Sequence, residues 1–141
     1  MINVLKKKYP KNGKFNVSMG LKIKEAAKEN NVPNDYGVNL IYEGFDCNGE
    51  LIYIGRSGTI QSDGTMGSQG IRKRLGMKQD GMYRNDFFKK EMEKRQKGIS
   101  VAWFVTFNIA GQKTLPALAE SEAMQEFYEL EGRLPELNKS F

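Results

Sequence analysis

Two tyrosines, Tyr42 and Tyr53, lie in short apolar runs on either side of an Asn-Gly dipeptide at positions 48–49. Asn-Gly favours a two-residue hairpin turn, because both central residues of such a turn need a positive φ. In that register Tyr53 faces Gly44. Tyr42 then faces Gly55, and all four residues share one face of the ribbon. Phenols beside glycines leave a hollow that a phosphate can approach closely; simple cross-strand packing is the alternative.

A carboxylate and an arginine are predicted to point toward the core. A helix is expected from Leu115 or Pro116 to about Glu131, followed by Gly132 as its C′ residue. Glu120 falls on its apolar stripe. Arg74 shares one side of a second predicted helix, 71–78, with apolar neighbours. An inward carboxylate needs either a metal ion or an arginine as partner, and both readings stay open here.

Further elements must position these side chains. A helix is predicted over 21–30, an exposed loop over 56–70 and a helix over 84–97 that serves as scaffold. The segment 99–108 is apolar at nearly every position, so we expect a buried central strand that joins the hairpin in one sheet. Residues 1–35 are predicted to form a basic extension that packs on a domain spanning 36–141.

Composition limits the chemistry. The 141 residues include no histidine and one cysteine, Cys47, so a zinc site of the usual kind is not expected. A metal would have to be an oxygen-liganded ion such as Mg²⁺ or Mn²⁺. The net charge of +5 and the pI near 9.3 suit a polyanionic partner. With no long apolar run and no secretory signal, we expect a cytoplasmic protein without membrane association.

Taken in order, these residues resemble the GIY-YIG endonuclease family across 36–138. The matching features are the two tyrosines, an arginine in the phrase RKRL at 72–75, one glutamate on a later helix, and Pro135 followed by Asn138. Three features depart from the family pattern. Leu40 replaces the first glycine, the loop 56–70 is long, and Lys78 stands where many members carry Tyr or His. The glutamate-to-asparagine spacing is also long, which makes Glu122 the fallback for Glu120.

The resemblance implies an α/β (α+β) sandwich with a central three-stranded antiparallel sheet flanked by helices. It implies a DNA endonuclease with one divalent ion held by Glu120. In this reading Tyr42 helps to deprotonate or orient the attacking water, Tyr53 positions it and Arg74 stabilises the transition state. Asn138 is the family's late asparagine. The residues expected to contact DNA are Arg56, Ser57, Arg72, Lys73 and Lys78.

Two other classes of function remain as alternatives. An inert nucleic-acid-binding module of the same fold would bind DNA without a metal. A basic interaction domain, whose tyrosines only pack, would show no salt-dependent DNA binding. Family members act as monomers, dimers or tetramers, so a homo-oligomer stays open. No separate recognition domain is expected after residue 138, and specificity is assigned to residues 1–35, to the loop 56–70 or to a partner subunit.

Overall fold

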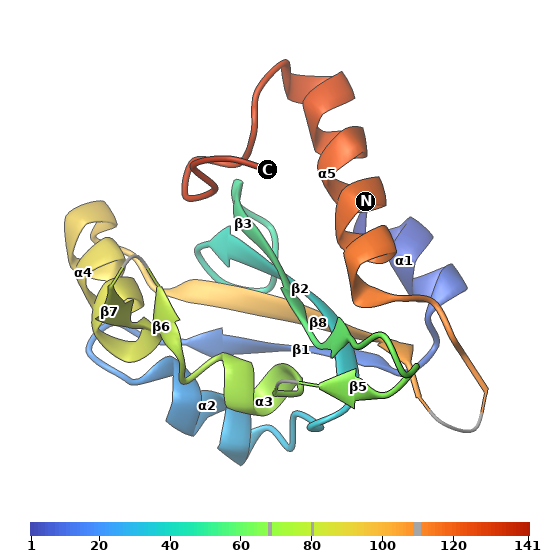
Figure 1. The fold of residues 1–141 in the computed structure, drawn as a ribbon. Coiled ribbons are helices and arrows are strands. Elements are labelled where there is room, and N and C mark those ends of the chain that lie inside the picture. The colour runs from blue at the N-terminus through green and yellow to red at the C-terminus, as the bar shows by residue number, and fades with distance from the viewer. Residues whose placement is uncertain (68, 80, 109–110) are drawn as a thin grey trace.

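The computed structural model describes residues 1–67, 69–79, 81–108 and 111–141 (Figure 1). Within these ranges the elements follow one another as α1 (Ile2–Lys8), β1 (Asn12–Val17), α2 (Ile23–Glu29), β2 (Tyr36–Glu43), β3 (Leu51–Ser57), β4 (Thr59–Ile60), β5 (Met66–Gly67), α3 (Ile71–Arg74), β6 (Lys78–Gln79), β7 (Met82–Tyr83), α4 (Arg84–Arg95), β8 (Ile99–Phe107) and α5 (Pro116–Glu131). None of the helices in the described part combines the length and apolarity needed to cross a bilayer.

The main sheet is antiparallel and has the strand order β1-β8-β2-β3. Three of its strands are the predicted hairpin and the predicted apolar strand, which becomes the interior β8. The fourth is β1, which pairs along β8 from Asn12 to Val17. The expectation of three strands is therefore wrong by one, because residues 1–35 contribute an edge strand as well as two helices.

Helices cover both faces of this sheet, so each face buries its own apolar cluster (Figure 1). Side chains of α2, α3 and α4 pack on the face that carries Ile41 and Tyr53. Side chains of α1 and α5 pack on the face that carries Tyr42 and Ile54. Because β8 lies between the two layers, nearly every one of its residues is buried, as its apolar sequence predicts.

The connection between β2 and β3 differs from the predicted two-residue turn. β2 ends at Glu43 and β3 begins at Leu51, so the connection spans residues 44–50, and at its base the backbone N–H of Glu43 donates to the carbonyl of Glu50 at 2.8 Å. Its left-handed residues are Gly44, Asp46 and Cys47, and not the Asn-Gly pair. Contacts from neighbouring strands hold this longer loop: the Asp46 N–H donates to an Asn16 side chain, and the Cys47 N–H donates to a Ser100 hydroxyl.

A bulge in β3 separates the two tyrosines. Tyr42 pairs with Leu51, whereas the adjacent Ile41 pairs with Tyr53, which leaves Ile52 as the extra residue. An extra residue reverses the alternation of faces beyond it. Tyr42 therefore joins the cluster under α5 and Tyr53 joins the cluster under α2, α3 and α4. The prediction that both phenols share one face is wrong.

Most of the predicted helices are present. The structure confirms the helices expected around α2, α4 and α5, including Gly132 in the left-handed region after α5. The helix predicted over 71–78 is shorter, because α3 ends at Arg74 in a tight turn where the Gly76 N–H bonds to Lys73. Lys78 instead pairs with Tyr83 as part of β6, and its side chain lies outside the described part of the structure.

Candidate active site

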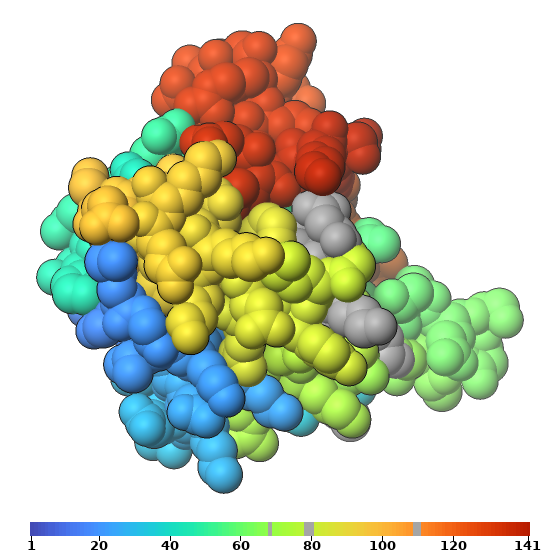
Figure 2. Space-filling model, turned by 90° about the vertical axis from the view of Figure 1, so that its left-hand side faces the viewer, coloured from blue at the N-terminus to red at the C-terminus, as the bar shows by residue number. Residues whose placement is uncertain are grey.

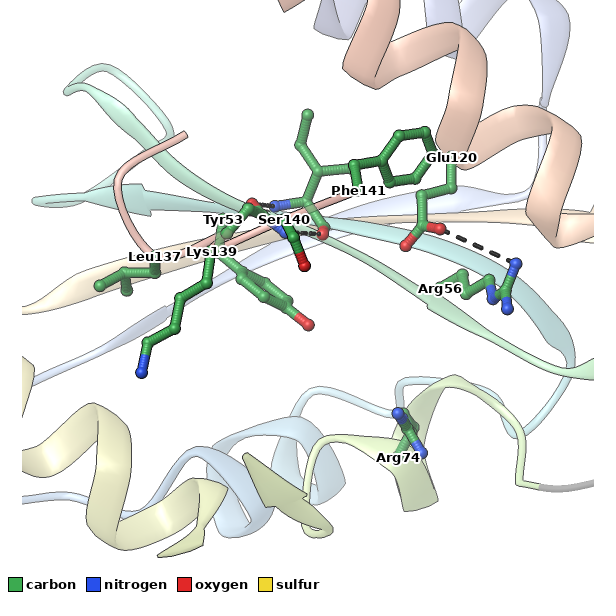
Figure 3. Close-up of a pocket in the computed structure, with 10 residues that line it drawn as sticks. Tyr53, Arg56, Arg74, Glu120, Leu137, Lys139, Ser140 and Phe141 are labelled. Carbon is green, nitrogen blue, oxygen red and sulfur yellow. Dashed lines mark hydrogen bonds and ion pairs between the residues drawn. The ribbon is translucent and has the colours of Figure 1, made fainter. Parts of the chain in front are cut away.

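Most of the predicted catalytic residues line one cavity. This cavity of about 530 Å³ lies beside β3, the edge strand of the sheet (Figure 3). It is lined by Tyr53, Ile54, Arg56, Arg74, Glu120, Leu137, Asn138, Lys139, Ser140 and Phe141. Four of the five residues predicted to be catalytic are in this set, and they come from β3, α3, α5 and the segment after α5.

The edge position of β3 lets side chains from both faces of the sheet meet. Figure 3 shows Glu120 extending from α5 and Arg74 from α3 on opposite sides of β3, with the phenol of Tyr53 pointing into the space between them. Arg56, at the end of β3, points toward Glu120. A charged ligand in this space would contact groups from both helical layers.

Glu120 is turned inward, as its place on the apolar stripe predicts. Its side chain is 13% exposed, and Nη1 of Arg56 lies 3.9 Å from its Oε1. Burial raises the pKa of this carboxyl, while the positive charges of Arg56 and Arg74 oppose that rise. The ion pair is formed by Arg56 and not by Arg74, the partner considered from sequence. Glu122 pairs with Lys8 at 2.8 Å on the surface and does not line the cavity.

The residues that line the cavity fit an ion such as Mg²⁺, which keeps several waters, better than a metal held entirely by protein ligands. In the described ranges, no group of three or more His, Cys, Asp or Glu side chains gathers. Glu120 is the one residue with a carboxylate side chain among the described residues that line the cavity. Mg²⁺ is typically bound by one or two carboxylates and retains several waters or substrate phosphates. Glu120, which has only a long contact to a half-exposed arginine, is suited to that role.

Arg74 is fixed by the start of α3. Gly70 caps this helix against residue 34: a Cβ at Gly70 would lie 1.8 Å from the carbonyl oxygen of Asn34, so a larger residue would not fit. The Ile71 N–H donates to the carbonyl of Asp35. Among the described residues, the buried Nε of Arg74 has no hydrogen-bond partner. Arg74 also lines the cavity, so its guanidinium can donate to an anion there.

Tyr53 is held from three sides. Its side chain is 9% exposed and packs edge-on against Phe88, with ring centroids 6.2 Å apart. A Cβ at Gly55 would lie 2.6 Å from Cε2 of Tyr53, so the glycine leaves room for the ring. Nη2 of Arg84 donates to the phenol oxygen at 3.1 Å, and the guanidinium carbon lies 5.3 Å from the ring centroid. These contacts set the orientation of the phenol.

Arg84 was missed by the sequence argument, which assigned the helix over 84–97 to the scaffold. The signal was present, because Arg84 shares the i, i+4, i+8 spacing of Phe88 and Met92. All three side chains are buried in the structure. An arginine on an apolar stripe predicts an inward-facing charge, just as the glutamate at position 120 does.

Tyr42 lies away from this cavity. It is buried on the other face with Leu51 and Phe127, beneath α5. Burial raises the pKa of Tyr42, and the nearby Cys47 and Glu126 add to that rise. A phenol in this environment keeps its proton, which argues against the predicted role of Tyr42 in deprotonating water.

Of the remaining predicted site residues, Asn138 and Ser57 are held within the protein, whereas Arg72 and Lys73 lie on its surface. The amide of Asn138 is used by the backbone of Ile54: its Oδ1 accepts from the N–H and its Nδ2 donates to the carbonyl, each at 2.9 Å. Ser57 is 1% exposed, whereas Arg72 and Lys73 are exposed on α3. Asn138 therefore fixes the segment after α5 to β3, and the two basic residues of α3 are free to contact a large anion.

No family model, curated protein or solved structure matches the chain. The GIY-YIG resemblance accordingly rests on the motifs themselves, and the function is argued from the geometry of the cavity.

Proposed function

We propose that the protein is a metal-dependent DNA endonuclease of the GIY-YIG type. The observation that supports this proposal is the shared cavity, which gathers a phenol, a guanidinium and one carboxylate side chain from three separate elements. These are the groups that phosphodiester hydrolysis requires: a metal ligand, a donor for the developing negative charge and a group that orients water. The net charge of +5 is in keeping with a DNA partner.

In this mechanism Glu120 would hold Mg²⁺ or Mn²⁺, which would supply positive charge at the scissile phosphate. Arg74 donates to a non-bridging oxygen, where negative charge increases as water attacks phosphorus and the ester oxygen departs. The attacking water gives its proton to solvent, and the departing oxygen takes one from solvent. Tyr53 orients the reacting groups through its phenol. Arg56, half-exposed beside Glu120, contacts the DNA backbone. Tyr42 has no part in these steps, since it does not line this cavity.

Cleavage of supercoiled plasmid tests the proposal. Wild-type protein, with Mg²⁺ and with EDTA, is compared with Glu120→Gln and with the matched control Glu122→Gln, which changes a surface carboxylate on the same helix. We expect nicking or linearisation that needs Mg²⁺, a loss of at least about 100-fold in Glu120→Gln, and wild-type rates in Glu122→Gln. Equal losses in both variants would refute Glu120 as the metal ligand.

One observation favours an inert DNA-binding module instead. Arg56 already provides a positive partner for Glu120, with its Nη1 3.9 Å from Oε1 of the carboxylate. A module of this kind would bind DNA equally well with EDTA and in the Glu120→Gln variant, and would cleave no substrate. Binding measured by fluorescence anisotropy beside the plasmid assay distinguishes the two functions.

A further inference from the structure

Arg84 is a buried cation whose charge has no acidic partner among the described residues. Its side chain is 1% exposed, and its printed hydrogen bond goes to the phenol oxygen of Tyr53. Neither Nε nor Nη1 has a partner in the described part of the chain. Burial lowers the pKa of this guanidinium, the contact with Tyr53 raises it, and the charge of Arg74 lowers it further. An unpaired buried charge costs stability, so its presence calls for another explanation.

The geometry defines how the phenol of Tyr53 can be used. A guanidinium has donors and no acceptor, so Tyr53 must accept in its bond with Arg84. The single proton of the phenol is then left to donate elsewhere, and Tyr53 lines the cavity together with Arg74 and Glu120. A phenol that accepts from a cation is polarised and becomes a stronger donor itself.

We infer that Arg84 is a positioning residue that turns the Tyr53 hydroxyl into a fixed hydrogen-bond donor aimed at a phosphoryl oxygen in the cavity. This inference rests on the proposed nuclease function. Arg84 touches no substrate in this role. It fixes the ring through the contact over its face and fixes the direction of the hydroxyl through the Nη2 bond. A donor fixed before the reaction stabilises the charge that develops on the phosphate without a cost of reorganisation.

A double-mutant cycle on DNA cleavage tests the inference, using Arg84→Met, Tyr53→Phe and the pair of changes together. Methionine is apolar, of similar length, and removes the unpaired charge, so the melting temperature of Arg84→Met should equal or exceed that of the wild type. We expect kcat to fall by about 10- to 100-fold in Arg84→Met, with KM little changed. The double variant should be no slower than Tyr53→Phe alone, because Arg84 acts through the phenol.

Arg84→Lys provides a second variant should Arg84→Met fail to fold. Its ammonium keeps a charged donor for the phenol oxygen but loses the planar contact with the ring, so its kcat should lie between those of the wild type and Tyr53→Phe. Additive losses in the cycle, or wild-type kcat in both Arg84 variants, would overturn the role of Arg84 while leaving the nuclease proposal standing. Absence of cleavage by the wild type would overturn both.

Discussion

Burial acts against the charge of Glu120. Because burial raises the pKa of this carboxyl in the folded protein, its favourable contribution to stability is present below the unfolded pKa and is lost as the pH rises through the folded pKa. Above the unfolded pKa this buried carboxyl therefore weakens the fold, which is common for groups kept for function.

The first prediction is that Glu120→Gln is more stable than the wild type at about pH 8 and not at about pH 4, where both carry a neutral group. The expected gain is on the order of 1 kcal/mol, or about 4 °C in melting temperature. Thermal unfolding at both pH values measures it. An equal gain at both would show that the cause is packing and not ionisation.

The change in melting temperature on adding Mg²⁺ gives a second test of Glu120. Mg²⁺ that binds the folded state raises its melting temperature, because the ligand stabilises only the state that binds it. We expect this increase in the wild type and in Glu122→Gln, and not in Glu120→Gln. An increase that persists in Glu120→Gln would assign the ion to another place on the protein.

The second prediction separates the two tyrosines. Tyr53→Phe removes the hydroxyl that lines the cavity and should lower kcat by about 10²- to 10³-fold. Tyr42→Phe changes a hydroxyl that does not line the cavity and should leave kcat within about twofold of the wild type. Measuring both on one DNA substrate checks the prediction, and a loss of activity in Tyr42→Phe at unchanged melting temperature would contradict it.

At the scale of secondary-structure elements, β3 determines which side chains meet in the site. Its edge position lets α3 and α5 reach the same cavity from opposite sides, and its bulge assigns Tyr53 to the layer that contains Arg84. The segment after α5 completes this arrangement, because Asn138 bonds to β3 as a neighbouring strand would.

The third prediction concerns Gly55. In Gly55→Ala the new Cβ would meet the ring of Tyr53 at 2.6 Å, and the ring is already held by Arg84 and Phe88. Either the phenol moves or β3 shifts, at a cost of about 1 to 3 kcal/mol. We expect cleavage to fall at least tenfold. The double variant should be little slower than Tyr53→Phe alone, and full additivity would place the effect of Gly55 elsewhere.

The fourth prediction concerns the attachment of the segment after α5. Asn138→Ala removes two hydrogen bonds to Ile54, each worth about 0.5 to 1.5 kcal/mol. Unfolding should occur at a lower temperature, and the amide hydrogen of Ile54 should exchange faster with solvent. Unchanged exchange at Ile54 would show that β3 does not depend on this contact.

At the scale of the whole molecule, the positive charge is spread over several elements. The β4–β5 hairpin projects from the body (Figure 2) and bears no lysine or arginine between residues 58 and 67. The basic pair Arg72 and Lys73 is exposed on α3, the helix that also presents Arg74 to the cavity. Lys6 and Lys7 on α1 are exposed under the opposite face of the sheet.

The fifth prediction is that DNA affinity falls steeply with salt and that Arg72→Gln with Lys73→Gln reduces the slope of log K against log salt by about 2. The matched control, Lys6→Gln with Lys7→Gln, removes the same charge from α1 and should leave the slope unchanged. Titrations at several salt concentrations measure both. Equal changes in the two variants would mean that net charge, and not a surface around α3, governs binding.

The sequence by itself determined the local elements and the limits on chemistry. The apolar run of β8, the stripe of α5 with its inward Glu120, and Gly132 at the end of that helix follow from periodicity and from backbone preferences of single residues. The absence of histidine limits the acid–base groups in the same direct way.

Only the tertiary structure decided the register and the partners. The bulge at Ile52 separated the tyrosines, β1 became an edge of the sheet, and Arg84 met Tyr53 across 31 positions of the chain. Local periodicity indicates whether a side chain is buried, but it does not specify which distant group it meets. That choice depends on how strands pair and layers pack, which is settled between residues far apart in the sequence.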